Sequence, residues 1–125
     1  MDVTYFLKNM SYDEKKQLAW NPNTSKNVLL DLSKEKDFGI RCAVARNPNT
    51  PMDILQYLAE DKDYGVRNDI ATHYKSSSKI LVTLLEYEKN LNKPNRYNIR
   101  AIYNHANCPE FAKRVIETLY GDTWL

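Results

Sequence analysis

The sequence predicts an all-α protein built from repeated units. The first observation is that NPNTSKNVLLDLSKEKDFGIRCAVA at 21–45 returns without a gap, 26 positions later, as NPNTPMDILQYLAEDKDYGVRNDIA at 47–71. The second is composition: 125 residues include only 3 Gly, and Leu, Ile, Lys and Glu are frequent, which suits helices better than a loop-rich β fold. Together they predict one domain of about three and a half units of about 26 residues, each with one helix and a shorter second helix.

Each unit opens on Asn-Pro-Asn-Thr, which predicts the end of one helix and the start of the next. An Asn before Pro is biased out of the α region, so the preceding helix ends there. Thr24 and Thr50 are then expected to be N-caps, and Pro51 suits a first helical position. Apolar residues follow at helical spacing, as in Leu55 and Leu58. The shorter second helices are expected at 37–46 and 63–72.

Incomplete copies extend the pattern to both sides. YNIR at 97–100 matches YGVR at 64–67, which gives a third unit with seven extra residues. Residues 107–121 repeat the start of a unit, and 11–20 repeat a second helix with Ser11 and Glu14 as a capping box. The predicted divisions are a half unit at 1–20, units at 21–46, 47–72 and 73–105, and a C-terminal cap helix at 106–125.

The stretch CAVARNPNTPMDILQYLAEDKDYGVR at 42–67 resembles the variant leucine-rich repeat family. Units of that family combine Asn-Pro-x-Thr-Pro, a Leu-rich helix, Asp-x-x-x-Val-Arg and Ala-Val-Ala. The resemblance covers roughly 11–120 and weakens after Thr72. It implies a short right-handed α-solenoid, related in style to HEAT-like repeats, that serves as an interaction scaffold. Some relatives append a cysteine cluster for an iron–sulfur centre, whereas this chain has 2 Cys.

Composition argues against several classes of function. A net charge of +2 is too near balance to predict a polyanion partner, and 2 Cys with 2 His are too few for a metal cluster. No Gly-rich phosphate loop and no Ser-His-Asp constellation is present, so we expect no cofactor and no enzyme activity. The longest apolar stretch, at 80–85, is too short for a bilayer, and the start lacks the features of a signal peptide. We expect a cytoplasmic protein without membrane contact.

An Asp-x-x-x-Arg pattern predicts a structural ladder. Arg41 follows Asp37 by four residues, and Arg67 follows Asp63 by four. This spacing places the two charges of each pair on one helix face, as an ion pair. Stacked units would turn such pairs into a ladder between neighbours, which favours a structural role over a ligand site.

The third unit departs from this pattern, because Arg96 stands where Asp is expected. Residues 89–109 contain no Asp or Glu. Basic residues interleaved with aromatic ones can bind nucleic acid or another anion; alternatively the segment is a solvated bend that pairs with acids elsewhere. The candidate anion-binding residues are Lys89, Lys93, Arg96, Tyr97, Arg100, Tyr103 and His105.

Aromatic residues also recur at the unit spacing, at Tyr12, Phe38, Tyr64 and Tyr97. They form a partner-binding stripe if exposed, and a packing column between units if buried. The remaining candidate is Cys108, in a cap slot three residues after His105, where a helix N-terminus would lower the pKa of a thiol.

The leading hypothesis is a non-catalytic module that binds a protein partner. The alternative is binding of nucleic acid, or of an acidic protein patch, through the basic segment 89–105, and a thiol enzyme at Cys108 is a remote third.

Overall fold

The computed structural model describes residues 3–125, and in this range the protein is all-helical, as expected. The second helices expected at 37–46 and 63–72 appear within a residue of these bounds. The helices of the described range are α1 (Val3–Lys8), α2 (Tyr12–Trp20), α3 (Lys26–Leu32), α4 (Phe38–Arg46), α5 (Met52–Leu58), α6 (Tyr64–Ala71), α7 (Ser78–Lys89), α8 (Arg96–Asn104) and α9 (Glu110–Trp124).

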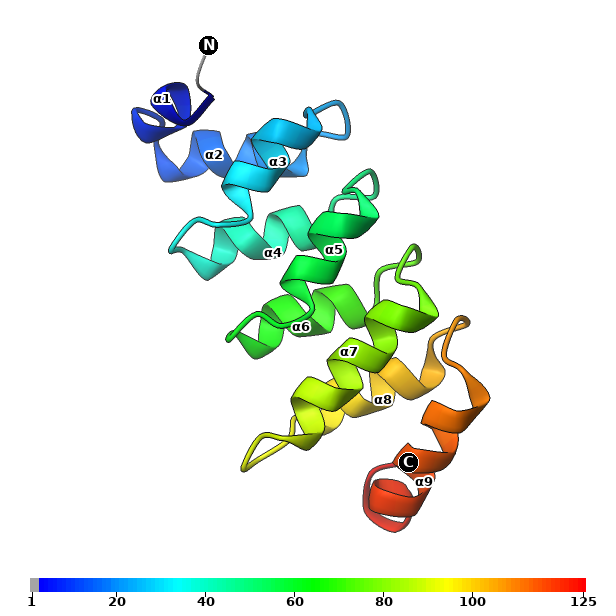
Figure 1. Ribbon diagram of the computed structural model, residues 1–125. Coiled ribbons are helices and arrows are strands. Elements are labelled where there is room, and N and C mark those ends of the chain that lie inside the picture. The colour runs from blue at the N-terminus through cyan, green and yellow to red at the C-terminus, as the bar shows by residue number, and fades with distance from the viewer. Residues whose placement is uncertain (1–2) are drawn as a thin grey trace.

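The even-numbered helices α2, α4, α6 and α8 lie side by side in chain order (Figure 1). The odd-numbered helices α3, α5, α7 and α9 form a second layer beside them. In Figure 1 the turns that lead into α4, α6 and α8 all lie at the left of the row, so these helices start on the same side of the molecule. None of the helices within residues 3–125 combines the length and the apolar composition that a bilayer crossing requires.

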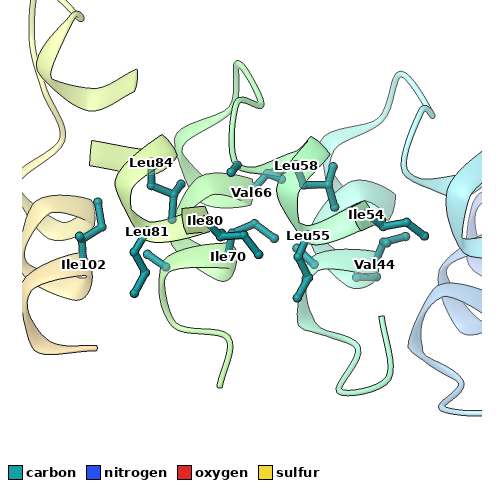
Figure 2. Packing of buried hydrophobic residues seen from close by; sticks show 14 of the residues in the cluster. Val44, Ile54, Leu55, Leu58, Val66, Ile70, Ile80, Leu81, Leu84 and Ile102 are labelled. Atoms are coloured by element: carbon teal, nitrogen blue, oxygen red, sulfur yellow. The ribbon is translucent and has the colours of Figure 1, made fainter. Parts of the chain in front are cut away.

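The apolar core lies between the two layers (Figure 2). Leu55 and Leu58 of α5 are fully buried, as their helical spacing predicted, and they lie among Val44 of α4 and Val66 of α6. The same pattern continues into α7 and α8, whose Leu84 and Ile102 belong to one continuous cluster with them. Because each helix buries its apolar side against its neighbours, the core runs along the whole row.

Two of the predicted N-caps are wrong by one residue. The caps of α3 and α5 are Ser25 and Pro51, not Thr24 and Thr50. The Thr24 hydroxyl instead donates to the carbonyl of Leu18, and the Thr50 hydroxyl donates to the carbonyl of Val44. Each Thr thus closes the turn onto the end of the preceding helix. The capping box of Ser11 and Glu14 at the start of α2 is confirmed.

Polar side chains also tie each turn to the turn before it. Asn47 Nδ2 donates to the carbonyls of Ala19 and Asn21 at 2.8 and 2.9 Å. His73 Nε2 donates to the Asn47 carbonyl at 2.9 Å, and His105 Nε2 donates to the His73 carbonyl at 2.7 Å. These bonds fix the offset between successive units, and so they fix the register of the even-numbered helices.

The third unit is six residues longer than its predecessors, not seven. Asn95 caps α8 by accepting from the Asn98 N–H, just as Asp63 caps α6. Asp63 and Asn95 are 32 positions apart, as are His73 and His105. The extra residues lengthen α7 to 12 residues, against 7 in α5. At the C-terminal end, α9 continues through Gly121 to Trp124.

Candidate interaction surface

The arginines of the predicted ladder pair between units and not within them. Asp37 and Asp63 are N-caps, whose carboxylates accept from backbone N–H groups of α4 and α6. Arg41 therefore binds Asp61, with its Nε and Nη2 at 2.8 and 3.1 Å from the carboxylate, and this hydrogen bond raises the pKa of Arg41. The predicted pairing of Asp37 with Arg41 is wrong because the cap residue lies outside the helix and turns its carboxylate back onto the backbone.

The same arrangement repeats along the row. Lys15 lies 2.8 Å from Glu35, and Arg67 Nε lies 2.9 Å from Glu88 Oε1. Sequence reasoning missed Lys15 and all three acids, although Lys15, Arg41 and Arg67 are 26 positions apart and the repeat itself was the available signal. These bridges hold neighbouring units together, which makes the ladder structural.

Glu88 is the centre of the last bridge and is completely buried. Its Oε1 accepts from Arg67 Nε and from Asn98 Nδ2 at 2.9 and 2.8 Å, and its Oε2 accepts from the backbone N–H of Asn95 at 3.0 Å. The Arg67 guanidinium also lies over the ring of Tyr87, 4.8 Å from its centroid. Both oxygens of the carboxylate thus accept hydrogen bonds. Through these bonds the buried Glu88 side chain joins α7 to α6 and α8.

The register of α8 removes Arg96 and Arg100 from the ladder. Because Asn95 is equivalent to Asp63, the residue equivalent to Arg67 is Ile99, which is fully buried. Arg96 and Arg100 are therefore not ladder residues, and both are exposed. The interpretation of Arg96 as a replacement for a ladder Asp is wrong, and the ladder ends at Glu88.

The seven candidate anion-binding residues separate into two groups. Lys89 pairs with Glu86 at 3.2 Å, the Tyr103 hydroxyl donates to Glu117 at 2.6 Å, and His105 binds the preceding turn. The other four residues are exposed, and their cations form no ion pair within residues 3–125. We call Lys93, Arg96 and Arg100 the basic end; Tyr97 lies beside it, 5.7 Å from the Arg96 guanidinium.

The recurring aromatic residues are exposed and do not form a packing column. Their exposed fractions are 43% for Tyr12, 59% for Phe38, 63% for Tyr64 and 64% for Tyr97. The first three begin α2, α4 and α6, whereas Tyr97 is the second residue of α8 and shares its register with Gly65. We call these four residues the aromatic row.

A groove lies between α2 and α4 beneath the first two rings of the row. Its volume is about 450 Å³. Gly39 of α4 is a close-approach position, because a Cβ there would collide with the Tyr12 hydroxyl. The groove is also lined by Tyr12, Lys16, Trp20, Asp37, Phe38, Cys42 and Arg46. An aromatic groove whose edges carry charges of both signs is suited to binding, and sequence reasoning missed Trp20 and Arg46 as its members.

The cysteines lack the chemistry of a nucleophile. Cys108 is buried, and burial raises the pKa of its thiol, contrary to the lowering expected from a helix N-terminus. Pro109, not Cys108, is the N-cap of α9. Burial and the nearby Asp69 also raise the pKa of Cys42, to about 12. Both thiols stay protonated at neutral pH, and within the described residues no cluster of three metal-ligating side chains is found.

No protein-family model, curated protein or solved structure matches this chain.

Proposed function

We propose that this protein is a non-catalytic interaction module that holds a protein partner on its even-numbered helices. The observation that carries the proposal is the aromatic row. Large exposed rings recur once per unit on helices that pack side by side, and aromatic residues are enriched at protein interfaces. Exposed rings also occur on the odd-numbered helices, as at Tyr57 and Phe111, so the recurrence of a ring at one position of each unit carries the proposal and exposure alone does not.

The arrangement of the units is part of the same proposal. We infer a short right-handed α-solenoid of the variant leucine-rich repeat type. Its support is the bridges between units, such as Arg41 to Asp61, and the linked turns from Asn47 to His105. Such repeats bind partners on the continuous surface that stacking creates. The free thiols of Cys42 and Cys108 suit a reducing, cytoplasmic location.

Binding of a polyanion is the second candidate, and the basic end favours it. Phosphate binding weakens steeply as salt rises, whereas an apolar interface does not. The two candidates are thus separated by measuring the affinity of the protein for single-stranded DNA, RNA and heparin at low and high salt.

The leading proposal is tested by capture from a lysate of the source organism. Phe38→Ala with Tyr64→Ala removes two rings of the aromatic row, and Tyr57→Ala with Phe111→Ala is the matched control on odd-numbered helices, at 52% and 60% exposure. We expect a partner that is retained by the wild type and the control and is lost with the first variant. Equal retention by both variants would contradict the proposal.

A further inference from the structure

The aromatic row has a defined repeat distance. Its rings occupy the starts of α2, α4, α6 and α8, which pack in sequence (Figure 1). Packed helices lie about 8–10 Å apart, so Tyr12, Phe38 and Tyr64, which are each the first residue of their helix, are expected at intervals of about 8–10 Å. Asn98 shows that α6 and α8 are in contact near their starts, because its Nδ2 donates to the Tyr64 carbonyl and its Oδ1 accepts from Asn68 Nδ2.

Among regular chain conformations, polyproline II matches this distance best. It has three residues per turn and rises about 3.1 Å per residue, so side chains at i, i+3 and i+6 share one side at about 9.3 Å intervals. A β-strand presents side chains on one face about every 6.6 Å, and an α-helix repeats every 5.4 Å. Aromatic-lined grooves are also the general binding site for polyproline II segments.

Charge along the row changes sign. The basic end carries Lys93 in the turn before α8 and Arg96 and Arg100 on α8, and none of these cations forms an ion pair within residues 3–125. The next two helices instead begin with the N-cap carboxylates of Asp63 and Asp37, directly beside Tyr64 and Phe38. A partner that is complementary to this surface has negative charge where it meets α8 and apolar groups against the rings of Tyr64 and Phe38. Around Phe38 the charges are mixed, because Asp37, Lys16 and Arg46 line the same groove.

From these observations we infer the chemistry of the partner. We propose that the row binds a polyproline II segment of a protein, with an acidic side chain against Arg96 and Arg100 and apolar side chains three and six residues away, against Tyr64 and Phe38. This inference rests on the proposed function and narrows it. From α8 to α4 the segment covers two helix spacings, which is about six residues at 3.1 Å each.

Nucleic acid fits this surface less well. A strand that follows the row carries a phosphate at every nucleotide, so it would bring phosphates close to Asp63 and Asp37. Like charges at short distance oppose binding. Stacking of bases on exposed rings is favourable, so single-stranded DNA belongs among the probes.

The test is a selection of displayed random twelve-residue peptides on three immobilised proteins. The baits are the wild type, the charge-reversed variant Arg96→Glu with Arg100→Glu, and a control, Lys79→Glu with Arg114→Glu, which reverses two exposed cations on α7 and α9. Urea unfolding first establishes that all three are folded. We expect the wild type and the control to enrich Pro-rich peptides with an acidic residue followed or preceded at intervals of three by apolar residues.

The charge-reversed bait supplies the decisive comparison. We expect it to enrich peptides with Lys or Arg in place of the acidic residue, and to bind the wild-type peptides at least tenfold more weakly. The same peptides enriched on both baits, or none enriched on the wild type, would overturn the proposal. So would tight binding of an oligo(dT) probe that is lost at high salt. If peptide selection fails while lysate capture still depends on Phe38 and Tyr64, only the partner chemistry is wrong, and the proposed function stands.

Discussion

Neutralising Glu88 is expected to destabilise the protein more than any surface charge change. The side chain is completely buried, and its carboxylate accepts from Arg67 Nε, Asn98 Nδ2 and the Asn95 N–H at 2.8–3.0 Å. In Glu88→Gln one oxygen becomes an amide nitrogen, which must face one of these donors. The Arg67 guanidinium, with a side chain only 4% exposed, also loses its counter-charge.

The expected cost is the cost of breaking a buried ion pair from one side, about 3–5 kcal/mol. Urea unfolding followed by circular dichroism measures it, and with an m-value of about 1–3 kcal/mol per molar the midpoint falls by about 1–5 M. Asp53→Asn is the matched control, because its bridge to Lys26 at 2.9 Å has both side chains more than half exposed. We expect the control to lose less than about 1 kcal/mol.

A double variant identifies the origin of the loss. Arg67→Met removes the unpaired cation, so Arg67→Met with Glu88→Gln is expected to be more stable than Glu88→Gln alone. A loss below about 1 kcal/mol for Glu88→Gln would refute the reasoning, since it would mean that the carboxylate is not held as the structure shows it.

The other predictions concern a core residue, a cap and a buried imidazole. Leu55→Ala should cost about 2–5 kcal/mol in urea unfolding, because Leu55 is fully buried, and a loss under about half a kcal/mol would contradict its place in the core. Asp63→Ala should cost about 1 kcal/mol because an N-cap is lost, and Asp63→Asn should cost less. A loss of several kcal/mol for Asp63→Asn would contradict the N-cap role and support an ion pair between Asp63 and Arg67. Burial lowers the pKa of His73, so below about pH 6.5 the unfolded chain binds a proton that the folded chain resists, and stability should fall as pH falls. The melting temperature at pH 7.5 and 5.5 measures this loss, and His73→Gln should show a smaller pH dependence; an equal slope in both proteins would refute it.

Helix positions were predictable because the signals that set them are local. The Asn-Pro turn ends one helix wherever it occurs, and the capping box at Ser11 starts another. The repeat then supplied a second copy of each signal, so the second helices at 37–46 and 63–72 were placed to within a residue. Such elements depend on neighbours within four or five positions, and the sequence contains these neighbours.

The register of α8 shows where local similarity misleads. YNIR shares its Tyr and its Arg with YGVR, which aligned Arg100 with Arg67 and gave seven extra residues. In the structure burial decides the register: Ile99 and Ile102 face the core, so Asn95 becomes the cap and Arg100 lies on the surface. A one-residue shift in sequence thus converted two supposed ladder residues into an exposed basic end.

What the sequence determined by itself is the all-helical fold, its unit length and most helix boundaries, because local propensity, capping and apolar spacing fix these. What only the tertiary structure decided is the partner of each long side chain and the exposure of the aromatic row. Arg41 pairs with Asp61, and Arg67 pairs with Glu88, across a boundary between units. The partners are 20 and 21 positions apart in the sequence. Tyr64 is exposed because stacking fills the space between helices with Val66 and Ile70 instead. Both outcomes depend on how whole units pack: the repeat marks Lys15, Arg41 and Arg67 as equivalent, but it does not say which acid of the next unit each cation meets.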